Sequence, residues 1–295
     1  MVHDSPATLA PHFLQACEPR PLPNRLLMCP PAHFDVIDVK NPHMEGQVGR
    51  VDRTAAAGQW HALRAAFERC GAKVSEIAPT PGCEDMVFCA NQTLVGIGRR
   101  GERICILSNM RYPSRQREVP AFEKWFAADG YRVVPGPAGI GLEGSGDAIW
   151  HPGRGLIWGG YGYRTEPAAY PHVADAFGVP VLRLKLLSNK FYHLDTCFCA
   201  VDERTVVIDP RCFEPRGLEL IRAIFERVVE VPPDEAEQGM ACNATALLGR
   251  GVVIQRGNPH TVAALRGLGY EVHEVETGEF LKSGGSVFCM KMYVF

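Results

Sequence analysis

The sequence lacks several features that mark particular classes of protein. It contains no uninterrupted apolar run of about 18 residues, the length that a membrane-spanning helix requires. It has no excess of basic residues, since 31 Lys and Arg stand against 33 Asp and Glu and give a formal net charge of −2. Because nucleic acids and anionic lipids attract a basic surface, we expect neither as a partner.

Signals of secretion and of a disulfide framework are also missing. Residues 1–24 have neither a basic stretch nor an apolar core, so we expect no signal peptide. Eleven cysteines are present, but the count is odd and no two form a C-x-x-C pair. Most of them lie in apolar runs, where a free thiol behaves as a small hydrophobic side chain. These features predict a protein of the reducing cytoplasm.

The sequence does contain a degenerate internal repeat. Each unit shows a strand, a turn, a second strand, a helix and a third strand, over roughly 45–60 residues. Four units begin near Glu84, Glu143, His193 and Ala241. A fifth begins at Gly284 and ends after one strand, and its missing parts resemble segments between residues 25 and 78.

The fifth unit, split between the two ends of the sequence, predicts a closed ring without exposed sheet edges. We therefore expect an α/β fold, a five-bladed α/β propeller of pseudo-fivefold ββαβ repeats. Residues 1–24 are predicted to form a loose N-terminal arm, and residues 25–295 a single catalytic domain. An ordinary α/β sandwich with incidental similarity between segments is the alternative. The predicted helices end at glycines, as a left-handed C-terminal cap favours: Gly71, Gly130, Gly178 and Gly269.

Equivalent positions of a radial repeat meet near its central axis. At these positions, at the start of the first strand of each unit, the sequence carries polar or reactive residues: Asp85, Glu143, His193 with Asp195, Asn243 and Cys289. Glu84 is an alternative to its neighbour Asp85. A purely structural ring would carry apolar or small residues there, because a buried charge is costly unless it is paired. The pattern therefore predicts an active site on the axis.

Cys289 is the candidate nucleophile of this site. It follows Gly284 and Gly285, which permit a close approach of backbone and ligand. A histidine and a cationic substrate beside a thiol lower the pKa of that thiol and favour attack by the thiolate. A buried strand cysteine with a packing role is the alternative.

His193 is the candidate acid–base residue. The period of two in a strand predicts that one strand face carries His193, Asp195, Cys197 and Cys199. These residue types permit a metal site, but no second cluster of ligands accompanies them, and we expect no metal and no organic cofactor. A core histidine that hydrogen-bonds to Asp195 is a further alternative. Acid–base catalysis is favoured because the thiol and carboxylates share the same ring.

Seven segments occur in one order along the sequence: LMCPPAHFDV, KNPHM, EDMVFCAN, LEGSGD, GYGYR, FYHLDTCFC and GGSVFC. Through these segments the chain resembles the guanidino-group-modifying enzymes over roughly residues 25–294. That superfamily contains arginine deiminases, dimethylarginine dimethylaminohydrolases, arginine dihydrolases and amidinotransferases, all with the five-bladed pentein fold. The chain looks most similar to the arginine dihydrolase domains.

The resemblance implies a role for each matching residue. Cys289 matches the nucleophile, and His193 matches the residue that protonates the leaving amine and then activates water. Glu143 and Asp85 match acids that pair with the guanidinium group. Asn91 matches an asparagine near the reacting carbon that bears on how far hydrolysis proceeds.

Further matching positions imply contacts with the rest of the substrate. Asn41, Arg115 and Arg164 match substrate-binding residues, and Asp195 is predicted to join them. The two arginines would hold an α-carboxylate, for which the planar guanidinium fork is well suited. For Arg115, which lies in the charged segment SRQRE, a solvated surface position is the alternative.

The predicted function is cysteine-dependent hydrolysis of the guanidino group of L-arginine through a covalent thiouronium intermediate. A dihydrolase would release ornithine and ammonia, and a deiminase citrulline and ammonia. Hydrolysis of dimethylarginine ranks second, because methylarginine hydrolases usually carry an acidic pair where this chain has Ala90 and Asn91. Amidino transfer and a catalytically silent guanidine-binding protein are further alternatives. A guanidino compound is the expected partner, and a homo-oligomer is left open.

Overall fold

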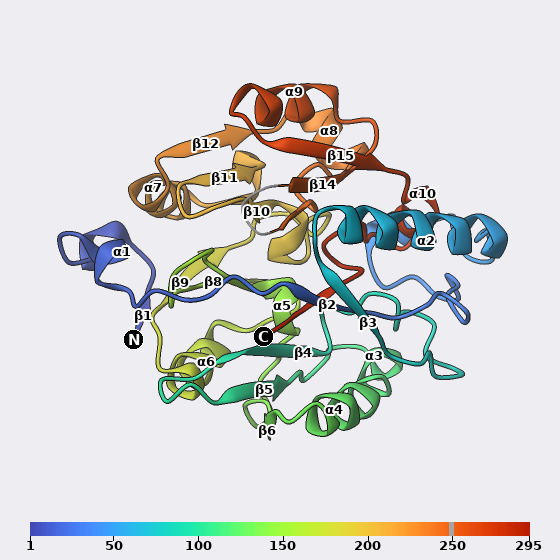
Figure 1. The fold of residues 1–295 in the computed structure, drawn as a ribbon, viewed down its shortest axis with the longest axis horizontal. Helices are drawn as coiled ribbons and strands as arrows, with labels where there is room; N and C mark the ends of the chain where they lie inside the picture. The colour runs from blue at the N-terminus through green and yellow to red at the C-terminus, as the bar shows by residue number, and fades with distance from the viewer. Residues whose placement is uncertain (248–250) are drawn as a thin grey trace.

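The strands of this protein form five separate small sheets (Figure 1). The structure, a computed structural model, describes residues 1–247 and 251–295. The fold is mixed α/β, as expected, with the longer helices toward the outside of the molecule (Figure 1). In the described residues, every helix is too short or too polar to cross a lipid bilayer.

Four of the sheets repeat one arrangement of consecutive strands. The first and second strands are antiparallel, and the second and third are parallel. One sheet contains β4 (Thr93–Ile97), β5 (Arg103–Leu107) and β6 (Arg132–Val134), and the next β7 (Ala148–Trp150), β8 (Ile157–Tyr161) and β9 (Val181–Lys185). The others contain β10 (Phe198–Ala200), β11 (Thr205–Ile208) and β12 (Arg227–Glu230), and β13 (Thr245–Leu247), β14 (Gly251–Gln255) and β15 (Glu271–Val275).

The fifth sheet joins the two ends of the chain. Its strands are β16 (Met292–Val294), β2 (Arg25–Met28) and β3 (Lys73–Glu76). β16 is antiparallel to β2, with Met292 opposite Leu27, and β2 is parallel to β3. The prediction of a unit split between the two termini is confirmed.

A helix connects each parallel pair of strands. These helices are α2 (Arg53–Arg69), α4 (Val119–Ala128), α6 (Tyr170–Phe177), α7 (Pro215–Ile224) and α9 (Pro259–Gly267). Shorter helices are α1 (Phe13–Ala16), α3 (Pro113–Gln116), α5 (Gly144–Asp147), α8 (Pro233–Gln238) and α10 (Gly278–Leu281). Single 3-10 turns are η1 (Pro6–Thr8), η2 (Pro42–Met44), η3 (Pro167–Ala169), η4 (Leu194–Thr196) and η5 (Pro210–Cys212).

Helix α2 shows how the sequence specifies these connections. The Asp52 carboxylate accepts hydrogen bonds from the first backbone N–H groups and so caps the start of the helix. Leu63 and Phe67, four residues apart, lie on one face and are fully buried. Burial of each such side chain contributes about 1.5–3 kcal/mol. All four predicted glycine caps have positive φ angles: Gly71, Gly130, Gly178 and Gly269.

The N-terminal segment is packed against the rest of the chain, so the prediction of a loose arm is wrong. β1 (Val2–His3) pairs in parallel with β9 and extends that sheet to four strands. Leu14 and Cys17 are buried in a core cluster with side chains of β8 and β9. The sheet edge at β9 is therefore covered by the segment that precedes residue 25.

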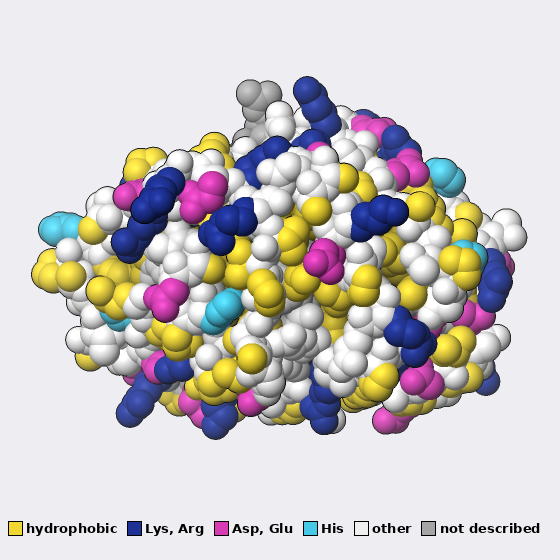
Figure 2. Space-filling model, turned by 90° about the horizontal axis from the view of Figure 1, so that it is seen from below, with side chains coloured by type: hydrophobic (Ala, Val, Ile, Leu, Met, Phe, Trp, Pro, Cys, Tyr) yellow, Lys and Arg dark blue, Asp and Glu magenta, His cyan; other side chains and the backbone are white. Residues whose placement is uncertain are grey.

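Charged side chains are distributed rather than concentrated on the face that Figure 2 shows. Lys and Arg side chains alternate there with Asp and Glu and with apolar patches. This face accordingly presents no extended field of one sign, in keeping with the net charge of −2.

Candidate active site

Six of the predicted site residues line one cavity: Asn41, Asp85, Asn91, Arg115, Arg164 and Cys289. They come from segments that lie far apart in the sequence. His193, Glu143 and Asp195 contact members of this set, as the following distances show. The structure therefore brings all the predicted residues into one region.

Cys289 lies in a short loop before β16 and is 3% exposed. Its thiol donates a hydrogen bond to Asp195 Oδ2 at 3.1 Å, and Asn243 Nδ2 donates to its sulfur at 3.2 Å. Gly285 is required in this loop, because a Cβ at that position would lie 2.4 Å from the Phe88 ring. The loop is thus closely packed around the sulfur.

Burial raises the pKa of the Cys289 thiol well above its ordinary value, and the negative charge of Asp195 raises it further. These shifts favour the neutral thiol, which donates its hydrogen bond to Asp195. The expected lowering of this pKa requires the positive charge of a substrate, which would lie beside the sulfur.

Asn243 holds the backbone of the loop that carries Cys289. Its Oδ1 accepts hydrogen bonds from the backbone N–H groups of Ser286, Phe288 and Cys289 at 3.1, 3.1 and 3.3 Å. Its Nδ2 also donates to the Asp195 carbonyl at 2.9 Å. The repeat places Asn243 at an axial position, but the sequence alone does not reveal this bracing role.

His193 and Glu143 form a buried pair beside Asn91. His193 Nε2 lies 2.7 Å from Glu143 Oε2, and His193 Nδ1 lies 3.4 Å from Asn91 Nδ2. Gly146 makes this approach possible, since a Cβ there would lie 2.3 Å from Asn91 Nδ2. The pair is thus fixed by the LEGSGD segment on one side and by Asn91 on the other.

Glu143 is ionised despite being fully buried. Burial favours its neutral form, but Arg164, His193 and the Arg111 backbone N–H together hold the pKa of the carboxyl far below its usual range. Arg164 Nη1 lies 3.1 Å from Oε2, and the Arg111 N–H donates to Oε1 at 2.8 Å. Both oxygens are therefore engaged, and direct contact of Glu143 with a guanidinium group stays a prediction.

The segment from His193 to Asp195 is not a strand, so the prediction of one strand face for His193, Asp195, Cys197 and Cys199 is wrong. η4 turns the backbone at Leu194–Thr196, and β10 begins only at Phe198. The turn directs His193 toward Glu143 and Asp195 toward Cys289. A search of residues 1–247 and 251–295 finds no group of three His, Cys, Asp or Glu that could hold a metal.

Asp85 lies in the cavity but is paired with a lysine. Lys40 Nζ lies 3.1 Å from Asp85 Oδ2 and 2.9 Å from Glu84 Oε1. Burial opposes the charge of Lys40, but Asp85, Asp38 and Glu84 keep its pKa above the ordinary value. Lys40 belongs to the KNPHM segment, but the sequence did not predict that it pairs with Asp85 and Glu84. Of the two adjacent acids, Asp85 lines the cavity.

Arg115 and Arg164 are both buried, so the surface alternative for Arg115 is wrong. Arg115 Nε bonds to the Glu118 carboxylate at 3.0 and 3.1 Å, and its Nη2 lies 3.3 Å from Asn91 Oδ1. Glu118 is a partner that sequence reasoning missed.

Two aromatic rings hold the other arginine. The Arg164 guanidinium lies 4.8 Å from the ring centroid of Tyr112 and 4.5 Å from that of Tyr192. Asn41 Nδ2 donates to the Ser283 carbonyl at 3.0 Å and thereby ties the start of η2 to the loop that carries Cys289.

Comparison with known proteins places this site in a family. The chain matches the family described as N,N dimethylarginine dimethylhydrolase, eukaryotic, over residues 36–295. The chain belongs to this dimethylarginine dimethylaminohydrolase family. The predicted resemblance to guanidino-group-modifying enzymes is thereby confirmed.

Curated relatives of this family member include a dimethylarginine dimethylaminohydrolase and a bifunctional arginine dihydrolase. It is 33% identical to the N(G),N(G)-dimethylarginine dimethylaminohydrolase of Mycobacterium tuberculosis, over 93% of this chain and 87% of the relative. It is 35% identical to the bifunctional arginine dihydrolase/ornithine cyclodeaminase AgrE of Nostoc sp., over 92% of this chain but only 38% of the relative. The chain thus spans less than two fifths of the length of that bifunctional protein.

Solved structures with the same fold include both groups. The N-terminal domain of a variant of ArgZ, covalently bound to a reaction intermediate, superposes with a TM-score of 0.87 at 33% identity. That match covers 92% of this chain and 97% of the ArgZ domain. A dimethylarginine dimethylaminohydrolase adduct with S-methyl-L-thiocitrulline superposes with a TM-score of 0.78 at 21% identity and shows the fold alone.

Proposed function

We propose that this family member hydrolyses the guanidino group of L-arginine, as a dihydrolase or deiminase, with Cys289 as the nucleophile. The observation that carries the proposal is a buried thiol hydrogen-bonded to a carboxylate in a cavity that two arginines and Asp85 also line. The similarity to AgrE and to the ArgZ domain, both named as arginine dihydrolases, supports arginine as the substrate.

Charge complementarity supports this substrate. Arginine carries a carboxylate at one end and a guanidinium cation at the other. Arg115 and Arg164 would bind the carboxylate, since each presents a planar fork of donors. Asp195, next to the sulfur, and Asp85 would attract the guanidinium group, and Asn41 would complete the site. In a buried cavity these attractions are stronger than in water.

The reaction begins when a bound guanidinium group lowers the pKa of the Cys289 thiol, which then passes its proton to Asp195, the carboxylate that accepts its hydrogen bond. The thiolate attacks the guanidinium carbon, and a C–S bond forms in a tetrahedral adduct. His193 donates a proton to the departing nitrogen, the C–N bond breaks, and ammonia leaves a thiouronium intermediate. His193 then accepts a proton from water, which attacks the same carbon and breaks the C–S bond to give citrulline.

Glu143 would act on this chemistry through His193. An ionised Glu143 accepts a hydrogen bond from the Nε2–H of His193 and so fixes the orientation of the imidazole ring. Nδ1 of His193, on the side of Asn91, is then left for proton exchange. A dihydrolase would repeat the cycle on bound citrulline and release ornithine, carbon dioxide and a second ammonia. No metal or organic cofactor enters these steps.

We also propose that the five sheets are the blades of one propeller around this site. The repeated strand order, the pairing of β16 with β2 and the convergence of the segments before the first strands support this arrangement. Residues 25–295 would form the single catalytic domain, and residues 1–24 an arm attached to it. The cytoplasmic location and a homo-oligomeric state stay predictions.

Hydrolysis of dimethylarginine is the second candidate, favoured by the family match and by the relative from Mycobacterium tuberculosis. It would use the same nucleophile and release dimethylamine. The presence of Ala90 and Asn91 where an acidic pair is expected favours arginine.

A product assay distinguishes these activities. The protein is incubated with arginine, methylated arginines, agmatine and citrulline, and ammonia, amines, citrulline and ornithine are quantified. Two ammonia per ornithine identify a dihydrolase, one ammonia per citrulline a deiminase, and dimethylamine the second candidate. Cys289→Ser should abolish turnover, whereas the matched control Cys70→Ser, at the end of α2, should not. Turnover by Cys289→Ser would refute the assignment of the nucleophile.

A further inference from the structure

Lys291, two residues after Cys289, is a lysine without contact to solvent. Its side chain is among the largest fully buried ones, with the residue 1% exposed. Within residues 1–247 and 251–295, its ammonium group is buried and has no hydrogen-bond partner. Lysine is almost never buried in this way unless a negative charge or an aromatic face compensates it.

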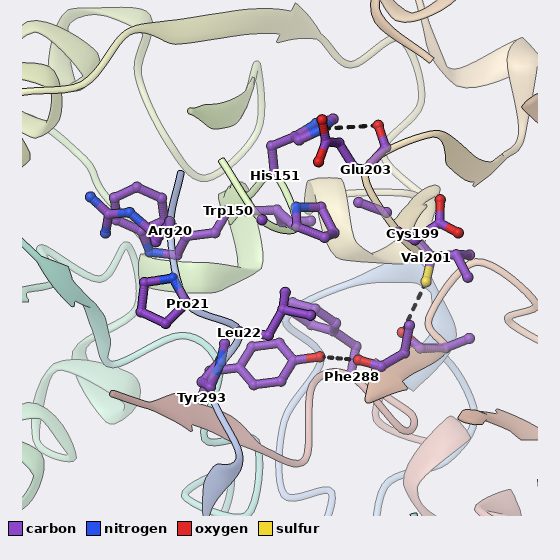
Figure 3. A pocket seen from close by; sticks show the side chains of 18 of the residues that line it. Arg20, Pro21, Leu22, Trp150, His151, Cys199, Val201, Glu203, Phe288 and Tyr293 are labelled. Atoms are coloured by element: carbon purple, nitrogen blue, oxygen red, sulfur yellow. Dashed lines mark hydrogen bonds between the residues drawn. The ribbon is translucent and has the colours of Figure 1, made fainter. Parts of the chain in front are cut away.

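Two aromatic rings provide part of this compensation. Lys291 Nζ lies 3.1 Å from the ring centroid of Phe288 and 4.0 Å from that of Tyr293. The same two rings line a mostly apolar cavity together with Leu22, Trp150 and Val201 (Figure 3). The surroundings of the ammonium group are therefore apolar, and the charge is poorly screened.

The acidic residues of that cavity are engaged elsewhere. Asp202 pairs with Arg227 at 3.4 Å and also accepts a hydrogen bond from Tyr270. Glu203 pairs with Arg154 at 2.8 Å. Neither is positioned as the counter-ion of Lys291.

The titratable groups that do act on Lys291 come from four segments. In decreasing order of their effect they are Asp195 of η4, Cys199 of β10, Cys289, and Cys89 before β4. Burial raises the pKa of Cys199 to about 12 and that of Cys89 well above its ordinary value, and it also raises the pKa of the adjacent Tyr293 phenol. These three groups are therefore uncharged at neutral pH, and burial keeps the Cys289 thiol neutral as well, which leaves Asp195, the acceptor of that thiol's hydrogen bond, as the source of negative charge.

Asp195 is itself incompletely satisfied. One of its oxygens accepts the hydrogen bond from Cys289, while Oδ1 is buried without a partner among the described residues. The site thus contains one unpartnered cation, Lys291, and one unpartnered carboxylate oxygen, Asp195 Oδ1. Among the charged groups, Asp195 has the largest effect on the pKa of Lys291, and Lys291 is the charged group that acts on the pKa of Asp195.

We propose that the Lys291 ammonium group is the built-in counter-ion of the Asp195–Cys289 pair, and that it acts as a positioning residue which favours loss of the proton from the pair. The proposal rests on Cys289 being the nucleophile of the proposed function. While the thiol donates to Asp195, the pair carries one negative charge, which Lys291 balances. Without Lys291 the pair retains a second proton to a higher pH, and the thiolate forms less readily.

Burial shifts the pKa values of Lys291 and Asp195 in opposite directions. Burial lowers the pKa of Lys291 to about 7 and raises that of Asp195 to about 7, and each charge favours the other. Removal of the charge of Lys291 therefore changes the pKa of Asp195 and, through the hydrogen bond from Cys289 to Asp195, the pKa of the thiol.

The test measures the thiol itself and needs no substrate. The protein is treated with iodoacetamide over a range of pH, and alkylation of the Cys289 peptide is followed by mass spectrometry. Lys291→Met should shift the midpoint of the alkylation profile upward by about one pH unit, equivalent to about tenfold slower alkylation near neutral pH. Lys291→Arg should keep a midpoint near that of the unchanged protein, and Lys124→Met, at an exposed position of α4, should show no shift.

Each outcome decides the proposal. An unchanged midpoint in folded Lys291→Met, or an equal shift in Lys291→Arg, would overturn it. If Lys291→Met does not fold, Lys291→Gln tests the same loss of charge. If neither folds, adding Asp195→Asn to Lys291→Met should restore folding when the two are counter-ions, and failure to do so would count against the proposal. Because alkylation requires no turnover, a protein inactive on arginine but with these shifts would refute only the proposed substrate.

Discussion

Replacing Asn243 with alanine should disable the nucleophile without removing any atom of Cys289. Asn243 Oδ1 accepts hydrogen bonds from the backbone N–H groups of Ser286 and Cys289, and no other acceptor for these groups is evident in the described residues. The N–H of Phe288 retains the Asn243 backbone carbonyl at 2.9 Å. The substitution therefore leaves two buried donors unpaired.

The expected magnitude follows from these two donors. An unsatisfied buried donor costs about 1–3 kcal/mol, so the two unpaired donors in Asn243→Ala should lower the free energy of unfolding by about 2–6 kcal/mol. The thiol also loses the donor at 3.2 Å and the fixed position of its loop. Since a displacement of about 1 Å at a reacting group can cost about 100-fold, kcat should fall by at least that factor.

Asn258→Ala is the matched control. Asn258 is also fully buried and donates to two backbone carbonyls, those of Gly239 at 3.0 Å and Gln255 at 2.7 Å, but it lies between β14 and α9. Urea unfolding should show a comparable loss of stability in both variants, whereas kcat should fall only in Asn243→Ala. Equal activities of the two folded variants would refute the bracing role of Asn243.

Further expectations concern the charged residues of the site. Arg164→Ala should raise KM for arginine by at least about tenfold, because the substrate carboxylate loses its partner. KM for agmatine, which has no carboxylate, should stay nearly unchanged, and equal effects on both substrates would exclude a carboxylate contact. Because the pKa of Glu143 is lower in the folded than in the unfolded chain, its ionised form stabilises the fold above about pH 4, and this contribution is lost as pH falls. Glu143→Gln should therefore flatten the acid limb of stability measured by urea unfolding, and an unchanged limb would contradict this. Lys40→Met should lower the free energy of unfolding by about 3–5 kcal/mol, because it leaves Asp85 and Glu84 as buried charges without their partner. An unchanged unfolding free energy in calorimetry would contradict this and would mean that water replaces the lysine.

The arrangement of the elements was largely predictable because it depends on local signals. A glycine with positive φ directly after the last helical turn ends that helix, as Gly71 and Gly178 show. Alternating and helical periodicities then gave the unit, and its incomplete copy after Gly284 predicted the pairing of β16 with β2. The course of residues 1–24 was not predictable, because two residues of β1 carry too little pattern to identify the edge of β9 as their partner.

The turn at η4 shows where periodicity fails. The segment from His193 to Cys199 alternates like a strand, but its first half bends so that Asp195 reaches Cys289 across 94 residues of sequence. A hydrogen bond over that separation is a property of how the units meet. Only the part from Phe198 onward has a strand partner, β11.

The sequence by itself predicted which residues come together in the cavity, because a repeat brings equivalent positions to equivalent places. The resemblance to guanidino-group-modifying enzymes added Asn41, Asn91, Arg115 and Arg164 to this prediction. Only the tertiary structure decided the buried partners of those residues, such as Glu118 for Arg115 and Lys40 for Asp85. It also decided that the neutral thiol of Cys289 is favoured, since burial raises the pKa of that group. The physical reason is that charge interactions and desolvation depend on distance and on excluded water, and both are set by contacts between units rather than by the pattern within one.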